Sequence, residues 1–160
     1  MTPAELAAFY ERDMNKLIAE IEAFKKEEDL WKVSGSIKNS SGNLALHLIG
    51  GMNFLIGTTL AGTGYVRNRD LEFTATGITR RELIEQLNAL KTLIVQTLNA
   101  MPAEQLNRPY PRFFDKENAT VSYVLTQLLL HLNYHIGQIN YLRRMMDGNG
   151  EWAIKEAAGI

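Results

Sequence analysis

The sequence of 160 residues contains no cysteine, and this absence removes several kinds of chemistry at once. Disulfide bonds, thiolate metal sites and a cysteine nucleophile are all excluded. A strong charge of one sign is also missing, because 17 basic and 18 acidic residues give a formal net charge of -1. Nucleic-acid binding usually requires a basic face, so we expect no nucleic-acid partner.

The sequence also lacks a long apolar run and a leader pattern. No apolar run reaches the roughly 18 residues that would suggest a membrane span. The first residues, from Met1 to Glu5, lack the basic-then-apolar pattern of a signal peptide. We therefore expect a cytoplasmic protein with no membrane partner. Hydrophobic residues make up 46 % and charged residues 22 %, a composition and length that suit one folded domain over residues 1–160.

Four stretches combine the apolar spacing of helices with helix start signals, at residues 2–28, 39–60, 79–99 and 120–147. Alternating strand patterns do not occur, so we predict an all-α fold, a four-helix bundle. Residues 61–77 form a long connection between the second and third helices, either a functional loop or a crossover. The tail, residues 149–160, either docks or frays.

All three histidines of the chain lie in apolar helical stretches. His131 and His135 are four residues apart, so one helical face can present both rings. His47 belongs to the second predicted helix and precedes Gly50 and Gly51 by about one turn, where another group could approach closely. A single histidine on such a face is more often a core residue than a ligand. The three together favour a metal site built from His47, His131 and His135.

Three imidazole ligands leave coordination positions open, which is typical of catalytic rather than structural metal sites. Zinc, nickel, copper and iron all accept such ligands, so the sequence predicts a divalent metal without identifying it. The reactive group would be a water or a thiol activated by the metal. The pattern is not that of a metalloprotease helix or a di-iron bundle, because leucines occupy the positions where Glu-x-x-His motifs need glutamate, namely Leu44, Leu128 and Leu132.

A ligand histidine usually forms a hydrogen bond through its second ring nitrogen. The candidates for this role, or for substrate contact, are Asp13, Asn43, Asn133, Tyr134 and Gln138. Asp13 interrupts an apolar stripe, and we favour a solvated edge of the first helix over a buried partner for a histidine. Asn43 and Gln138 suit boundary positions facing water as well as they suit positions beside a ring.

The connection between the second and third helices contains Arg67 and Arg69. Both side chains could bind an anionic group near the pocket. They could instead pair with Asp70 and Glu72 and fix the loop, and we favour this alternative because four opposite charges lie so close together. No carboxylate occupies an obvious general-base position.

The order of these motifs resembles that of the DinB-like (DinB/YfiT-like) metalloenzyme superfamily. The resemblance rests on a histidine in the second helix and on His131-x-x-x-His135 followed by Gly137-Gln138-Ile139. The stretch from Arg67 to Phe73 is similar to a motif of one functionally unassigned branch. The resemblance implies a four-helix bundle, often a homodimer, in which the three histidines bind a divalent metal. Characterised members include thiol-dependent transferases and isomerases that use small thiols such as bacillithiol or mycothiol.

Three functions are compatible with these patterns. The first is a metal-dependent transferase that joins a low-molecular-weight thiol to a small-molecule electrophile. The second is a hydrolase that uses a water activated by the metal. The third is a non-catalytic bundle, in which the histidines pack together or hold a metal for stability, with a surface that also dimerises.

Overall fold

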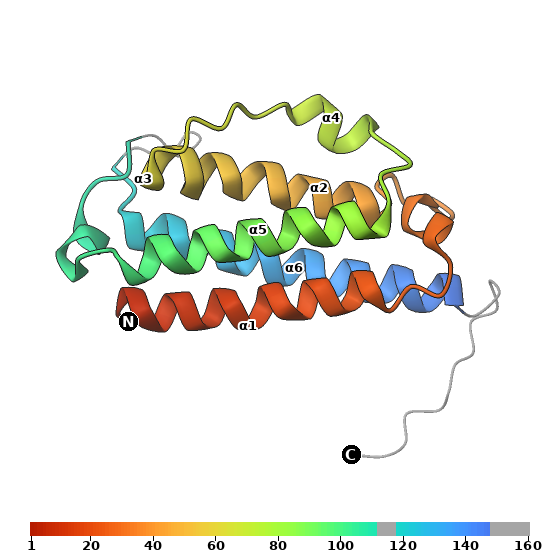
Figure 1. The fold of residues 1–160 in the computed structure, drawn as a ribbon, viewed down its shortest axis with the longest axis horizontal. Helices are drawn as coiled ribbons and strands as arrows, with labels where there is room; N and C mark the ends of the chain where they lie inside the picture. The colour runs from red at the N-terminus through yellow and green to blue at the C-terminus, as the bar shows by residue number, and fades with distance from the viewer. Residues whose placement is uncertain (112–117, 148–160) are drawn as a thin grey trace, which may run out of the picture.

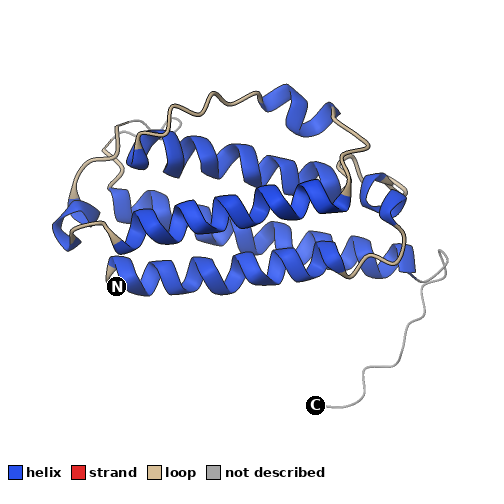
Figure 2. Cartoon of the chain, in the orientation of Figure 1, coloured by secondary structure: helices blue, strands red, loops and turns tan. Residues whose placement is uncertain are grey.

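A computed structural model describes residues 1–111 and 118–147, and this part of the chain is helical (Figures 1 and 2). No strand occurs in these two ranges, where one isolated bridge joins Pro109 to Thr120. The all-helical class predicted from the sequence is therefore confirmed. The predicted docking or fraying of the tail, residues 149–160, lies outside the described residues.

Four long helices form the body of the protein, α1 (Pro3–Glu22), α2 (Ser41–Met52), α5 (Arg80–Asn99) and α6 (Val121–Asp147). Helix α2 continues through a π-helical segment, η2 (Asn53–Thr58), into the short helix α3 (Thr59–Ala61). The connections carry further short helices, namely η1 (Glu27–Trp31), α4 (Arg69–Thr74) and η3 (Ala103–Asn107). Each long helix lies within a predicted stretch, but α1 ends at Glu22 and not near residue 28. The short helix α4 was not predicted.

The helix starts follow from side chains that satisfy the first free backbone amides. Thr2 and Thr79 each form a capping box with the glutamate three residues later, Glu5 and Glu82. Ser40 Oγ accepts a hydrogen bond from the backbone amide of Asn43 at 3.2 Å and so begins α2.

Helices α2 and α5 run in the same direction, opposite to α1 and α6 (Figure 1). Helix α1 packs against α5 and α6, and α2 packs against the same two helices. Because α2 and α5 are parallel, the connection between them must return along the length of these helices, which makes it a crossover. It passes over the outer side of α2, and its helix α4 packs there.

The core lies between the four long helices and is apolar. Fully buried side chains from each helix meet in it, among them Met14, Leu48, Leu87 and Leu132. The segment Ser41–Ala61 is long and apolar enough for a membrane span, because an 18-residue window of it has a mean hydropathy of 1.5, but 56 % of that window is buried inside the protein. A buried core helix has the same composition, so this property is weak evidence for membrane insertion.

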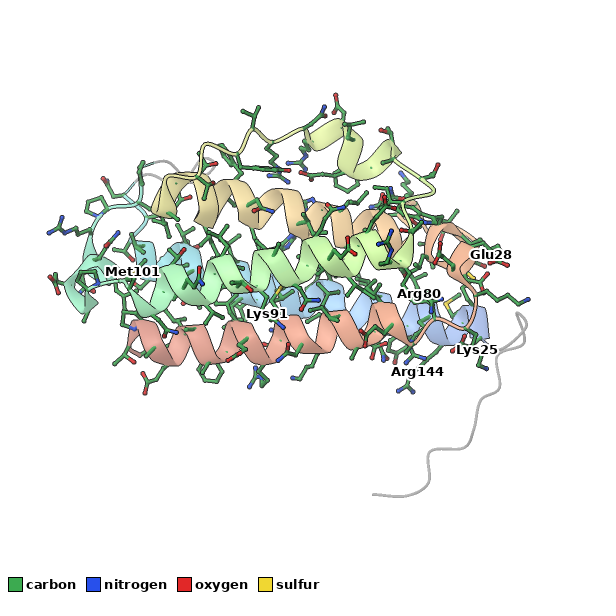
Figure 3. All side chains as sticks on the ribbon, viewed as in Figure 1. Lys25, Glu28, Arg80, Lys91, Met101 and Arg144 are labelled. Carbon is green, nitrogen blue, oxygen red and sulfur yellow. The ribbon has the colours of Figure 1, made fainter. Side chains whose placement is uncertain are left out.

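Polar contacts at the surface tie neighbouring helices together. Lys91 lies on α5, where Figure 3 labels it. Its Nζ atom donates a hydrogen bond to Asn15 Oδ1 of α1 at 2.9 Å. In the connection after α1, the indole Nε1 of Trp31 donates a hydrogen bond to the carbonyl of Ile78 at 3.2 Å. A Cβ atom on Gly42 would come within 2.6 Å of the Trp31 ring, so glycine allows this ring to lie against α2.

Candidate metal centre

The three histidines come together from two helices, His47 from α2 and the other two from α6. His131 Nε2 lies 3.1 Å from His47 Nε2 and 3.1 Å from His135 Nε2. A tetrahedral ion bound to nitrogen at about 2.1 Å holds its ligand atoms about 3.4 Å apart. The three rings therefore have the spacing of a site that could hold a metal ion.

The proton count of this cluster favours a cation at its centre. The second nitrogens of His47 and His135 face oxygen acceptors, so their protons belong on Nδ1 and their Nε2 atoms carry lone pairs. A single proton on His131 Nε2 can serve one of these neighbours and leaves the other lone pair without a donor. With its proton on Nδ1 instead, His131 would present a third lone pair, and a metal ion would satisfy all three at once.

The local environment keeps His131 in the neutral form that metal binding requires. Desolvation of its ring lowers the pKa of His131 to about 4, and the nearby His135, His47 and Arg67 act in the same direction. The pKa of His135 is also lowered, chiefly by burial. Both rings are therefore neutral at pH 7 and available as ligands.

Glu72 of α4 fixes the orientation of His47. Its Oε2 atom lies 2.9 Å from His47 Nδ1, and the Glu72 side chain is only 5 % exposed. Arg67 donates to both carboxylate oxygens, from Nε at 2.6 Å and from Nη2 at 2.8 Å. Burial opposes ionisation, but these contacts with Arg67 and His47 lower the pKa of Glu72 overall. The carboxylate is thus an ionised partner for the outer nitrogen of a ligand ring, as in many metal sites.

Two features of α2 make room for Glu72 and hold its backbone. A Cβ atom on Gly50 would collide with the Glu72 carboxylate, so glycine is needed for this contact. The side-chain amide of Asn43 donates hydrogen bonds through Nδ2 to the backbone carbonyls of Glu72 at 3.2 Å and Ala75 at 2.9 Å. Asn43, a predicted candidate, is therefore buried and acts on the backbone of Glu72 rather than on a ring.

His135 has a partner in its own helix. Its Nδ1 atom lies 2.6 Å from Gln138 Oε1, so the structure brings this predicted candidate to a ring nitrogen. Tyr134 is 63 % exposed, and its ring centroid lies 5.3 Å from that of His135. Tyr134 thus lies at the edge of the site, in contact with a ring but facing solvent.

Asp13 differs from the sequence-based expectation. A solvated edge was favoured, but the side chain is fully buried at 0 % exposure. Its carboxylate accepts hydrogen bonds from Arg12, Lys16 and Asn133, which compensate for lost hydration. Arg12 foremost holds the pKa of Asp13 well below its usual range, against the effect of burial. Asp13 therefore links α1 to α6 through Asn133, and no contact joins it to a histidine in the described part of the chain.

The two arginines of the crossover have different surroundings. Arg67 pairs with Glu72, as the favoured alternative predicted, and its Nη2 atom also lies 3.4 Å from His47 Nδ1. Arg69 is exposed, and its guanidinium lies 5.9 Å from the centroid of the Phe73 ring. No ion pair joins Arg69 to Asp70 or to another carboxylate within residues 1–111 and 118–147, so that part of the expectation was wrong.

Two hollows adjoin the histidines. A cavity of about 380 Å³ is bordered by His47 and His131 together with Arg67 and Arg69. A second hollow of about 550 Å³ is bordered by His135, Gln138 and Tyr134. The histidine cluster is therefore reachable by a small molecule, and the first cavity contacts two of its three rings.

Sequence reasoning missed the role of Glu72, which it treated only as a loop charge. Its contact with His47 spans 25 residues of chain and exists because the crossover folds back over α2. One signal was available in the pair Gly50-Gly51, whose cost within a helix indicated that a group approaches there.

The chain was also compared with known proteins. A family model described as "Protein of unknown function (DUF1572)" matches residues 5–156. A search of curated proteins found no match.

Proposed function

We propose that this chain, which belongs to the DUF1572 family, is a metal-dependent enzyme that joins a small thiol to an electrophile. The observation that carries the proposal is the convergence of three imidazole Nε2 atoms beside a cavity. Three protein ligands with free access are typical of catalytic rather than structural metal sites. The same arrangement argues against a metal held for stability alone.

The residues of the chain have separate tasks in this proposal. His47, His131 and His135 would hold the ion through their Nε2 atoms. Glu72 and Gln138 accept the Nδ1 protons of His47 and His135, which fixes both the tautomer and the ring plane. A divalent ion in such a site supplies Lewis acidity and lowers the pKa of a bound thiol or water.

Thiol transfer is favoured over hydrolysis by the side chains around the cavity. Among the described residues that border it, none is a carboxylate. Glu72, the nearest acid, is already occupied by Arg67 and His47. A thiol has an ordinary pKa near 8.5 and ionises without a strong base, whereas attack by water is usually assisted by a carboxylate. The sulfur would bond to the electrophile as its leaving group departs, and the thiol proton would pass to solvent.

We further propose that the fold is a four-helix bundle of the DinB-like type and that the protein is a cytoplasmic homodimer. The positions of the three histidines on α2 and α6, and the packing of the four long helices, support the family type. Exposed apolar side chains on α6, at Leu130, Tyr134 and Tyr141, support association. Size-exclusion chromatography with light scattering would measure the oligomeric state.

The test of the proposed activity is a thiol-loss assay with protein purified without a histidine tag. Low-molecular-weight thiols are mixed with a generic electrophile in the presence of zinc, nickel or iron, and the wild-type chain is compared with His131→Ala. Metal-dependent acceleration in the wild type alone supports the proposal. Turnover of an ester or amide without any thiol would instead indicate a hydrolase. Absence of both activities, with metal-dependent stabilisation retained, would favour a non-catalytic site.

A further inference from the structure

We infer that the cavity beside His47 and His131 binds a small amphipathic anion, an apolar body with a carboxylate, phosphate or sulfonate, and that Arg69 selects the anionic group. This inference rests on the proposed function, because it treats the cavity as the substrate site of the metal centre. It goes further by giving the substrate a chemical class and by naming a residue that determines specificity.

The buried side of the cavity is apolar. Leu48 and Met52 of α2, Leu55 of η2 and Leu128 of α6 border it, and each of these residues is buried. A cavity of about 380 Å³ lies within the range of small-molecule sites, which are mostly apolar with a few placed polar groups. The apolar part of a ligand would therefore lie between α2 and α6.

The mouth of the cavity carries an uncompensated positive charge. The charge of Arg67 is balanced by Glu72 through two hydrogen bonds, and its side chain is only 15 % exposed. Arg69 borders the same cavity, is exposed, and forms no ion pair with any carboxylate that the structure describes. Arg69 therefore places a positive charge beside this cavity that no described carboxylate balances.

The contact between Arg69 and Phe73 leaves the arginine available for a ligand. A guanidinium over an aromatic ring keeps its planar edge of N–H donors free, and this edge matches carboxylate and phosphate oxygens in a bidentate manner. Any ion held by the three histidines would add positive potential at the same cavity. An anionic head group is therefore favoured over a neutral or cationic one.

The hollow beside His135 offers an internal control. It also carries one cationic side chain, Lys38, together with Tyr134 and Tyr141. Only His135 of the three histidines borders it. The affinity of a ligand that binds at the His47–His131 cavity should therefore change when Arg69 is substituted and stay the same when Lys38 is substituted.

The experiment is isothermal titration calorimetry on the full chain with four probes of equal chain length, octanoate, octyl phosphate, octanol and octylamine. Each probe is titrated into metal-free protein and into protein loaded with zinc. We expect octanoate and octyl phosphate to bind about tenfold or more tightly than octanol, because hydrogen bonds to charged groups are among the stronger ones. Octylamine should bind more weakly than octanol. Equal binding of octanoate and octanol to both forms of the protein would overturn the inference.

Variants at the mouth assign the effect to one residue. Arg69→Ala should weaken octanoate binding about tenfold and leave octanol binding unchanged, and Arg69→Lys should recover part of the loss. Lys38→Ala is the matched control and should bind all probes as the wild type does. Circular dichroism would check that each variant, substituted at an exposed residue, is folded. Unchanged octanoate binding in Arg69→Ala, or an equal loss in Lys38→Ala, would contradict the assignment.

Failure of this inference can be told apart from failure of the proposed function. Zinc binding and thiol transfer without any preference for anionic probes would leave the proposed function intact and overturn this inference alone. Octanoate binding that depends on Arg69, in a protein that neither binds zinc nor consumes thiols, would support the anion site and overturn the proposed function.

Discussion

His47 Nδ1 lies 2.9 Å from Glu72 Oε2, and this contact joins the centre of α2 to the short helix of the crossover. The same carboxylate accepts two hydrogen bonds from Arg67. The crossover is therefore more than a connection between α2 and α5, because it supplies the group that orients one ring of the candidate metal centre.

Removal of the Glu72 charge should weaken metal binding. Glu72→Gln keeps an oxygen acceptor but leaves Arg67 without its anionic partner, and loss of such a supporting group typically lowers metal affinity about 10–100-fold. Competition with a chromophoric chelator measures the affinity. Glu85→Gln is the control, because Glu85 is an exposed acid paired with an exposed arginine on α5. Equal affinity in the wild type and Glu72→Gln would show that the carboxylate does not support the site.

Two adjacent glycines of α2 should respond in opposite ways to the same substitution. Gly50→Ala places a methyl group against the Glu72 carboxylate, so we expect lower stability and weaker metal binding. A methyl group at Gly51 would meet Arg67 Nη2 at 3.5 Å, an ordinary contact. Gly51→Ala should therefore raise the free energy of unfolding by up to about 1 kcal/mol through helix propensity. Chemical denaturation measures both variants, and equal effects would contradict the packing at Gly50.

The buried carboxylate of Asp13 should stabilise the protein in a pH-dependent way. Its folded-state pKa lies below the unfolded value of about 3.9, so its contribution is present above that pH and is lost as the pH falls towards the folded pKa. Asp13→Asn should cost about 1–3 kcal/mol at pH 7, through the weakened hydrogen bonds with Arg12 and Asn133. The difference between the wild type and the variant should shrink below about pH 4. A difference that stays constant from pH 7 to pH 3 would rule out this role.

The metal-free protein should lose stability in a separate, higher pH range. His131 has a folded-state pKa of about 4 against an ordinary value of 6.5. Between these values the unfolded chain binds a proton that the folded chain does not, so the free energy of unfolding decreases as the pH falls from 6.5 towards 4. His131→Ala should reduce this slope, leaving the part that belongs to His135. Urea denaturation with a chelator present at several pH values measures the slope, and an unchanged slope in the variant would be inconsistent with a buried neutral ring.

The helices could be predicted because their signals are local. Thr2, Ser40 and Thr79 each cap the backbone amide three residues later in the chain. The helical period alone puts His131 and His135 on one face. The helix α4 was missed because six residues are too few for an apolar period to appear.

The groups around the histidines depend on contacts between distant parts of the chain. Glu72 reaches His47 only because the crossover returns over α2, and no local pattern determines its path. Asp13 is buried because Asn133, 120 residues later, is placed beside it when α1 packs against α6. Gln138 could be suggested in advance, since it lies three residues after His135 on the same helix.

The most direct test of the metal centre is elemental analysis of protein purified without a histidine tag, after exposure to zinc and removal of free metal. We predict about one divalent ion per chain in the wild type and a large loss of bound metal in His47→Ala, with helical content unchanged by circular dichroism. Equal metal content in the two proteins, or no bound metal in the wild type, would contradict a site shared by α2 and α6.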